Sequence, residues 1–349
     1  MKKRLLIGVL LSSLFLCSCT GNGIGDKEDT TSKHTKDVLA MDTYMNLTAY
    51  GDKAEHALEE AEKEIKRLDE LLSVSSKEGE VSIVNENGSE IVSEDTADLI
   101  ENSLKINEET EGAFDITIYP LMKEWGFTDE KYKIPEADIL HELLKNVDAS
   151  KIQYDKNTKQ LTLPDGVQID LGGIAKGYTS ARLMQVFKEN GVKSAIVSLG
   201  GNVQTCGKKP DGSLWKVAVQ NPDTNAAEET PYIGTLETHD QAVITSGGYE
   251  RYFEENGKTY HHILDPKTGY PADSGLISVT IVSEDGTVAD GLSTAIFIMG
   301  KEKGIEFWKK QSESFDMILQ EEGGSLSVTE GLEDSFSSEM KFQIIKRDA

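Results

Sequence analysis

The chain has 349 residues, with 61 acidic and 36 basic side chains and a formal net charge of −25. An excess of negative charge this large argues against nucleic acid and against an anionic membrane surface as binding partners. Only Cys206 lies beyond the N-terminal 19 residues, so the rest of the chain cannot form an internal disulfide and must be stabilised by its hydrophobic core.

The N-terminus has the pattern of an export signal. Basic residues 2–4 precede an apolar run at 5–16, which is too short for a stable transmembrane helix. The run ends at Ser18-Cys19, which resembles a bacterial lipobox, with an ordinary secretory signal as the alternative. We therefore expect 1–18 to be a lipoprotein signal peptide and Cys19 to be lipidated, which would place the protein on the outer face of the cytoplasmic membrane, held only by this anchor.

The composition changes after the signal. Residues 19–36 are rich in Gly, Thr, Ser, Asp and Lys and predict a flexible tether. Residues 37–349 are enough for one large domain, or for one domain of two intimate lobes.

The hydrophobic pattern of this domain alternates between strand and helix periods. In chain order it predicts a strand at 38–50, helices at 53–73, 95–110 and 135–146, strands at 152–154 and 160–163, a helix at 174–190, strands at 194–199, 215–220, 232–238, 242–245, 249–254, 258–264 and 276–283, and helices at 287–299 and 301–311. Strand-rich stretches and long helices mix without regular βαβ alternation. The predicted fold class is therefore α+β, with mixed or antiparallel sheets packed against long helices.

The segment 260–271, YHHILDPKTGYP, combines two histidines, an aspartate and a turn fixed by prolines. A rigid loop that carries the imidazole of His262 and the carboxylate of Asp265 suits a site that holds a polar substrate and moves a proton. The alternative is a hairpin exit in which both side chains satisfy backbone groups.

The segment 169–178, IDLGGIAKGY, predicts a glycine-rich turn into a helix with Lys176 in its first turn. Backbone N–H groups at a helix start favour an anion, and the lysine adds a full positive charge. The spacing differs from that of a Walker loop. A plain structural turn is the alternative.

In the segment 289–300, ADGLSTAIFIMG, Asp290 and Thr294 lie one helical turn apart on the same face. Their oxygens are hard ligands that suit Mg²⁺. The alternative is that Asp290 caps the helix.

The segment 112–127, GAFDITIYPLMKEWGF, contains four aromatic side chains that could form an apolar wall with Asp115 as a polar contact. Ordinary core packing is the alternative. The four are Phe114, Tyr119, Trp125 and Phe127.

Taken together and in order, these segments resemble the FAD:protein FMN transferase (ApbE) family over about residues 38–320. The matching blocks are AMDT at 40–43, GAFDIT at 112–117, IDLGGIAKGY at 169–178, SLGGNV at 198–203, TSGGYERYF at 245–253, HHILDPKTGYP at 261–271 and ADGLSTAIFIMG at 289–300.

The resemblance implies an enzyme that uses Mg²⁺ and takes FAD as its substrate. It would transfer FMN to a Ser or Thr hydroxyl of an exported acceptor protein and release AMP. The chemistry of the segments is compatible with this, since a diphosphate needs a metal and a cation to neutralise its charge. An FAD pyrophosphatase and a non-catalytic FAD-binding surface lipoprotein are the alternatives.

The resemblance also implies roles for single residues. Those implied as flavin contacts are Met41, Ala113, Phe114 and Asp115. Those implied as further FAD contacts, around the ribityl chain and the diphosphate, are Asp170, Lys176 and Ile263. Those implied at the metal are Asp290 and Thr294, with Ser293 nearby and a backbone oxygen of the turn ending at Ala175. His262 is implied near the diphosphate, where it would take the proton of the acceptor hydroxyl or position the phosphate.

The chain departs from the family pattern at two positions. Ser75 stands where the family often has an aromatic residue, and Ala181 stands where it often has an aspartate.

Overall fold

The computed structural model describes residues 29–222, 231–311 and 315–347. The predicted signal peptide and Cys19 lie outside the described residues. Among the helices of the described part of the chain, none is long and apolar enough to cross a membrane.

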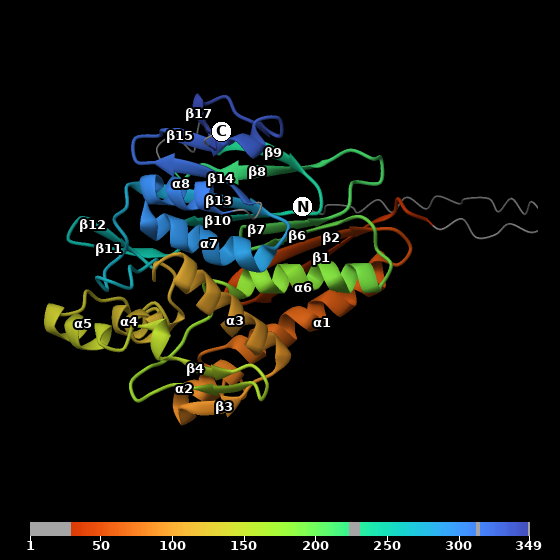
Figure 1. The fold of residues 1–349 in the computed structure, drawn as a ribbon. Helices are drawn as coiled ribbons and strands as arrows, with labels where there is room; N and C mark the ends of the chain where they lie inside the picture. Colours follow the sequence, from red (N-terminus) through yellow and green to blue (C-terminus); the bar gives the residue numbers. More distant parts are fainter. Residues whose placement is uncertain (1–28, 223–230, 312–314, 348–349) are drawn as a thin grey trace, which may run out of the picture.

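A nine-stranded sheet forms the centre of the molecule (Figure 1). All neighbouring strands pair antiparallel except β15 and β17. In spatial order the strands are β1 (Lys33–Ala40), β2 (Thr43–Tyr50), β6 (Ala195–Leu199), β7 (Asn202–Cys206), β10 (Ala242–Gly247), β13 (Leu276–Ser283), β14 (Phe315–Glu321), β15 (Leu326–Thr329) and β17 (Phe342–Ile345).

The segment predicted as one strand at 38–50 is in fact the hairpin β1–β2. Met41 and Asp42 form its turn, with φ angles of 50° and 55°. The alternation of apolar and polar residues continues on both sides of this tight turn. It therefore did not show that the segment forms two strands rather than one. β1 begins at Lys33, so the last four residues of the predicted tether, 33–36, belong to the sheet.

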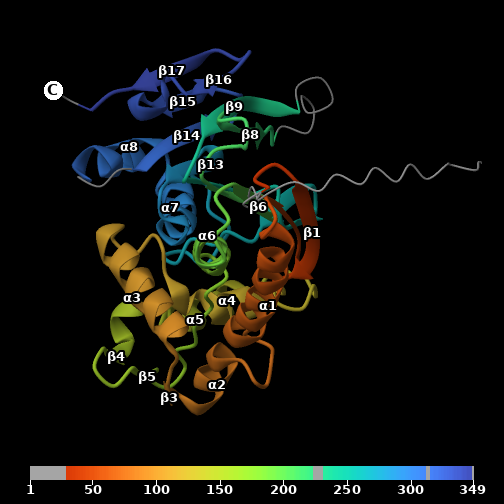
Figure 2. The same cartoon turned by 90° about the vertical axis from the view of Figure 1, so that its right-hand side faces the viewer.

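Helices cover one face of the sheet (Figure 2). They are α1 (Ala54–Leu72), α6 (Ala175–Glu189), α7 (Gly286–Met299) and α8 (Lys301–Lys310). The stripe of apolar residues predicted for the first helix is buried, from Ala54 to Leu72. Its part from Ala54 to Ile65 packs with β1, β2, β6 and α6 in one core cluster, whereas Leu68 and Leu72 pack in the cluster that includes the second lobe.

A smaller sheet covers the opposite face. It consists of β8 (Trp215–Gln220), β9 (Tyr232–Thr238) and the short β16 (Phe336–Ser337). Side chains alternate between the faces of a strand. Val243 of β10 therefore packs in the cluster with β8 and β9, whereas its neighbour Ile244 packs with α7.

A second lobe lies beside the helical face, and one continuous hydrophobic cluster joins it to α7. Its elements are α2 (Glu80–Asn87), β3 (Ser89–Ile91), α3 (Glu94–Glu109), the 3₁₀ turn Ile116–Ile118, α4 (Tyr119–Trp125), α5 (Ala137–Leu144), the 3₁₀ turn Ala149–Lys151, β4 (Gln153–Asp155) and β5 (Gln160–Thr162). The predicted α+β class, with one domain of two intimate lobes, is confirmed.

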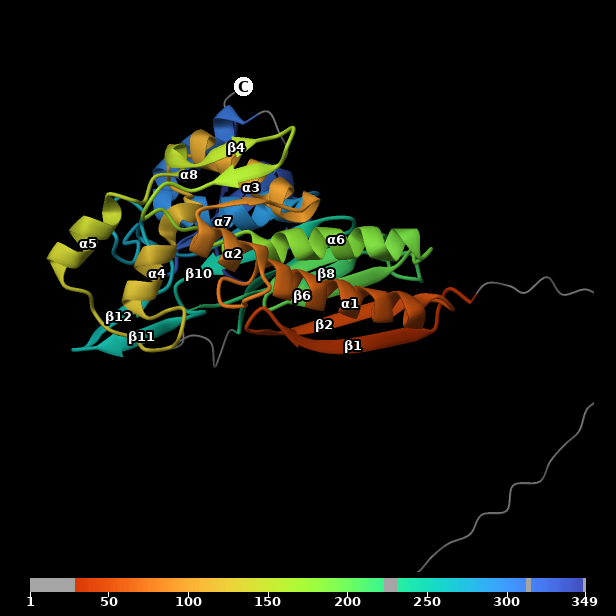
Figure 3. The same cartoon turned by 90° about the horizontal axis from the view of Figure 1, so that it is seen from below.

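The hairpin of β11 (Tyr252–Glu255) and β12 (Lys258–His261) lies beside α4 (Figure 3). The Trp125 ring of α4 packs against Phe253 and Tyr260 of the hairpin. The hairpin holds the loop that contains His262 against the second lobe.

Local sequence signals explain the ends of several helices. Ser93 caps α3 by accepting a hydrogen bond from the Thr96 N–H, as its position predicts. Asp285, and not Asp290, caps α7 by accepting hydrogen bonds from the N–H groups of Thr287 and Val288. The capping alternative for Asp290 is therefore wrong.

Candidate active site

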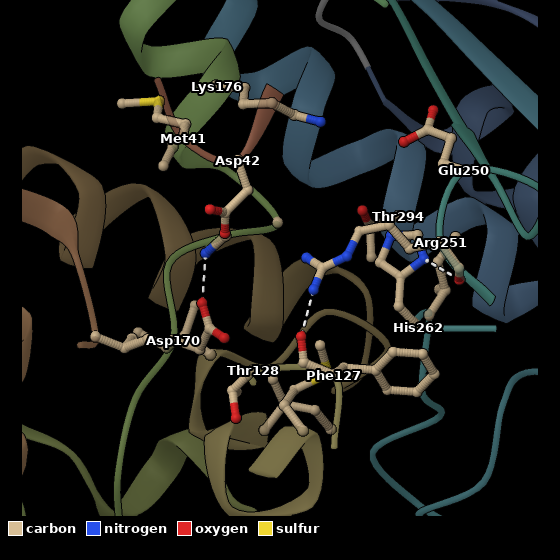
Figure 4. Close-up of a pocket in the computed structure, with 18 of the residues that line it drawn as sticks. Met41, Asp42, Phe127, Thr128, Asp170, Lys176, Glu250, Arg251, His262 and Thr294 are labelled. Carbon is tan, nitrogen blue, oxygen red and sulfur yellow. Dashed lines mark hydrogen bonds between the residues drawn. The ribbon is translucent and has the colours of Figure 1, made fainter. Parts of the chain in front are cut away.

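The segments singled out in the sequence meet at one cavity of about 800 Å³ (Figure 4). The β1–β2 turn, the loop before α6, the segment after β10 and the loop after β12 form its walls. Ten of the predicted site residues line it, namely Met41, Ala113, Phe114, Asp115, Asp170, Ala175, Lys176, His262, Ile263 and Thr294.

The glycine-rich turn at 171–174 leads directly into α6, as predicted, so Lys176 is the second residue of the helix. Its half-buried side chain enters the cavity (Figure 4). Burial raises the pKa of two nearby carboxyl groups, those of Asp290 and Glu250, and the positive charge of Lys176 opposes this rise.

Asp290 lies behind the cavity wall, in the second turn of α7. Its Oδ2 accepts a hydrogen bond of 2.7 Å from the Gly177 N–H. Burial raises the pKa of Asp290, while Lys176, the Gly177 N–H and Asn202 act in the opposite direction. A cation beside this carboxylate would favour its charged form further.

Thr294 and Ser293 occupy different places although they are neighbours. The Thr294 hydroxyl faces the cavity, 3.2 Å from Ser246 Oγ. Ser293 is fully buried; its Oγ donates to the Asp290 carbonyl over 2.8 Å and lies 2.7 Å from Ser246 Oγ. The predicted metal residue Ser293 is therefore engaged with the backbone of α7 and with Ser246 and does not lie at the cavity surface.

The donor set for a cation consists of oxygen atoms. It comprises the Asp290 carboxylate, the Thr294 hydroxyl and the backbone oxygen of Ala175, which already accepts a hydrogen bond from Thr179 Oγ1. Within the described ranges no group of three or more His, Cys, Asp or Glu side chains could hold a metal. Mg²⁺ prefers hard oxygen ligands, often one or two carboxylates completed by water and phosphate, so these residues fit that ion.

His262 follows β12 and lines the cavity. Its Nδ1 lies 3.1 Å from the Arg251 carbonyl (Figure 4). A carbonyl oxygen can only accept, so Nδ1 carries the proton and Nε2 keeps its lone pair. Burial, together with the charges of Arg251 and Lys176, lowers the pKa of His262 to about 3. The imidazole is therefore neutral at physiological pH, with the lone pair of Nε2 unprotonated.

The two residues singled out in segment 260–271 have different surroundings. His262 faces the cavity, whereas the side chain of Asp265 accepts a hydrogen bond from the Lys267 N–H and stabilises the turn. Gly269 has φ of 74°, the left-handed conformation expected in this turn.

Apolar side chains form another part of the cavity wall. Phe114 packs closely against the glycine turn, since a Cβ at Gly173 would lie 3.1 Å from its ring. Phe127 also lines the cavity. Trp125 is fully buried and donates from Nε1 to the Gly269 carbonyl, so the core alternative holds for Trp125.

The two aspartates predicted as FAD contacts, Asp115 at the flavin and Asp170 nearer the diphosphate, already accept hydrogen bonds within the protein. Asp115 accepts hydrogen bonds from Thr117 and from the Ala149 N–H, which fixes the loop after α3. Asp170 accepts one of 2.7 Å from the Gly172 N–H and so shapes the glycine turn. Burial raises the pKa of both carboxyl groups.

Glu250 and Arg251 also line the cavity and were not among the residues predicted from the sequence. Arg251 donates from its guanidinium to the Phe127 carbonyl and therefore bridges two walls. The Glu250 carboxyl has a pKa raised to about 7, mainly by its desolvated position. Both lie within the block TSGGYERYF. The adjacent Glu and Arg of that block were the signal from which the sequence could have predicted them as site residues.

The model of the ApbE family matches residues 41–319, most of the chain. The chain belongs to the ApbE family. A Haemophilus influenzae relative named FAD:protein FMN transferase is 30% identical, and the match covers 92% of this chain and 95% of that protein. A Klebsiella pneumoniae relative of the same name is 35% identical over 73% of this chain and 79% of its own.

The fold is also that of solved ApbE proteins. The crystal structure of the Thermotoga maritima ApbE protein has a TM-score of 0.80 to this chain at 33% identity, and the match covers 86% of this chain and 98% of that one.

The two departures from the ApbE pattern occupy different positions. Ser75 lines the cavity, at the end of α1, so a small hydroxyl stands where an aromatic ring was expected. Ala181 is in α6, on the turn after Lys176, and is not part of the cavity wall. Of the two, Ser75 is therefore the one that changes the surface offered to a flavin.

Proposed function

We propose that this ApbE-family protein transfers FMN from FAD to a Ser or Thr hydroxyl of an exported acceptor protein, with release of AMP. The observation that carries the proposal is the meeting of a neutral His262, Lys176 and the Asp290–Thr294 pair around one cavity whose wall is partly apolar. The names of the curated relatives support the same reaction.

FAD would bind with its isoalloxazine against the apolar part of the wall and its diphosphate near Lys176. Phe114 and Ile263, both almost fully buried, provide a rigid apolar surface. Lys176 provides a positive charge beside the N-terminus of α6, where backbone N–H groups favour an anion.

Asp290, Thr294 and the backbone oxygen of Ala175 would hold Mg²⁺. When bound, the ion would neutralise negative charge on the diphosphate during phosphoryl transfer. Asp290 would keep its carboxylate in place through the Gly177 N–H.

His262 would act as the general base. Its Nδ1–H is held by the Arg251 carbonyl, which leaves Nε2 to take the proton of the acceptor hydroxyl. The hydroxyl oxygen would form a bond to the phosphorus of the FMN half, and the bond from that phosphorus to the bridging oxygen would break. AMP would leave with the electron pair of that bond.

One assay distinguishes this reaction from its alternatives. The protein is incubated with FAD, Mg²⁺ and a candidate acceptor protein, and the products are separated on a denaturing gel and by chromatography. Transfer gives covalent flavin fluorescence on the acceptor together with AMP. A pyrophosphatase gives free FMN and AMP without a fluorescent acceptor, and a binding protein gives neither.

The His262→Gln variant uses the same assay to test whether His262 acts as the general base. Loss of a positioned general base costs about 10²- to 10⁴-fold in rate, so we expect the fluorescent acceptor band to disappear while FAD binding persists. His239→Gln is the control, because His239 pairs with Asp240 at an exposed position outside the cavity lining. Full transfer by His262→Gln contradicts the proposed role of the histidine.

We also propose that the protein acts outside the cytoplasmic membrane, held by lipid on Cys19. The proposal is supported by the basic and apolar residues before Ser18-Cys19 in the sequence. Two acyl chains anchor a protein stably, whereas one binds only marginally.

A further inference from the structure

A buried amide, that of Asn202, lies close to the proposed cation site. The proposed transfer of FMN gives it no role. Asn202 is the first residue of β7 and is 1% exposed. Its Nδ2 is one of four buried side-chain polar atoms in the described residues that have no hydrogen-bond partner. Such a group destabilises a folded protein, and its persistence therefore needs a reason.

The position of Asn202 suggests that reason. It directly follows the tight turn Gly200–Gly201, whose φ angles are 61° and 98°. Gly200 lines the cavity, and a Cβ there would lie 2.2 Å from Thr43 Oγ1 of the β1–β2 hairpin. The turn therefore fixes the start of β7 relative to the cavity wall.

From this position β7 faces the crossing of α6 and α7. Residues two apart point to the same side of a strand, and Gln204 shows what lies on that side. Its Oε1 is 2.6 Å from Ser180 Oγ in α6, and a Cβ at Gly286 in α7 would lie 2.5 Å from it. Asn202 lies two residues nearer the cavity on the same side of the strand, so its amide faces the same two helices, on the side of the Asp290 carboxylate.

We infer that Asn202 is a positioning residue that orients the Asp290 carboxylate for the cation: Nδ2, which has no hydrogen-bond partner in this structure, would donate to that carboxylate once the cation is bound. The inference rests on the proposed function. A carboxylate with two oxygens can accept from the Gly177 N–H on one side and from the amide on the other, which restricts its rotation. A neutral amide does this without cancelling the negative charge that attracts the cation.

A purely structural role for Asn202 makes a different prediction. An unpaired buried amide that only fills space can be replaced by an apolar side chain of similar size at little cost or with a gain in stability. Asn202→Leu would then leave the cation affinity unchanged. Loss of a group that orients a metal ligand instead lowers metal affinity about 10- to 100-fold.

The experiment measures cation binding directly. Mn²⁺ replaces Mg²⁺ as the probe, and its binding to the folded protein is followed by the loss of the free-ion signal in electron paramagnetic resonance, with and without FAD. The variants are Asn202→Leu and Asn202→Ala, each checked by circular dichroism and thermal unfolding without cation. Asn46→Ala is the matched control, because Asn46 also donates to a carboxylate, that of Asp37 over 2.7 Å, but on the exposed face of β2.

We expect both Asn202 variants to bind Mn²⁺ 10- to 100-fold more weakly, with thermal stability of Asn202→Leu at or above that of the parent chain and with Asn46→Ala unchanged. Parent-like Mn²⁺ affinity in both variants, combined with loss of binding in Asp290→Asn, overturns the role of Asn202 and leaves the proposed cation site intact. Mn²⁺ binding that does not depend on Asp290 overturns both.

Discussion

The backbone N–H of Gly177 donates to Oδ2 of Asp290 over 2.7 Å, across 113 residues of sequence. Gly177 is the third residue of α6, so its N–H has no partner within the helix. A carboxylate from α7 therefore completes the N-terminus of α6 beside the cavity. This single contact fixes the segment that carries Lys176 relative to the segment that carries Asp290 and Thr294.

The first prediction concerns the close approach of the two helices. A Cβ at residue 177 would lie 2.1 Å from the Gly286 carbonyl oxygen and 2.5 Å from the Asp290 Cβ. Gly177→Ala must therefore separate α6 from α7, and we expect it to destabilise the protein by about 3 kcal/mol, at the upper end for overpacking. Urea denaturation measures the effect.

Gly291→Ala is the control for this substitution. Its Cβ would meet Ile106 Cδ1 at 2.6 Å, which is the flexible end of a side chain and can move. A loss of stability in Gly177→Ala no greater than that in Gly291→Ala would contradict the importance of the helix contact.

The second prediction separates charge from hydrogen bonding at residue 290. Asp290→Asn keeps an oxygen that can accept from the Gly177 N–H but removes the negative charge that attracts a hard cation. We expect near-complete loss of AMP release and of flavin transfer, with little change in melting temperature without cation. Asp285→Asn, at the true N-cap of α7, should keep its activity, since asparagine also caps. Mg²⁺-dependent transfer by folded Asp290→Asn would exclude the cation site.

The third prediction concerns Lys176 and the affinity for FAD. A hydrogen bond to a charged group contributes about 1.5–3 kcal/mol, so Lys176→Ala should weaken FAD binding roughly tenfold or more while the fold persists. Lys188→Ala, at the exposed end of the same helix, should bind FAD like the parent chain. Titration by fluorescence quenching gives both affinities. Equal affinities for the two variants would rule out a role of Lys176 in binding.

The fourth prediction links His262 to the pH dependence of stability. The pKa of His262 is about 3 in the folded protein, against an ordinary value of 6.5. Between these values the unfolded chain binds the additional proton, so the folded state loses stability as the pH falls below about 6.5. His262→Gln removes this contribution, and stability should fall less steeply from pH 7.5 to 5 in the variant. The same slope in both proteins, measured by urea denaturation, would show that His262 is not held neutral.

The fifth prediction concerns Cys19 and location. Cys19→Ser removes the proposed lipidation site, so the protein should be released from the membrane or remain unprocessed. Fractionation of cells followed by mass spectrometry of the N-terminus measures both outcomes. A Cys19→Ser protein that is processed and retained like the parent chain would refute the anchor.

Local sequence predicted well wherever the structure depends on neighbouring residues. The apolar stripe of α1, the cap at Ser93 and the start of α6 just before Lys176 follow from contacts within about one helical turn, and the sequence contains all of those partners. The ordered motifs also predicted the family, because several blocks matched together.

Other features required the packed structure. The sequence pattern did not separate β1 from β2, and it did not reveal α2, α4, β7 or the strands after residue 314. These elements are short, and their hydrophobic pattern does not distinguish a turn or a buried strand from a continuous segment.

For the site, the sequence determined which kinds of chemical group are available and their order along the chain. Only the tertiary structure decided that Asp290 completes α6, that Trp125 belongs to the core, and that Glu250 and Arg251 join the cavity. These assignments depend on hydrogen bonds and packing between segments far apart in sequence, and no local pattern contains the geometry of such contacts.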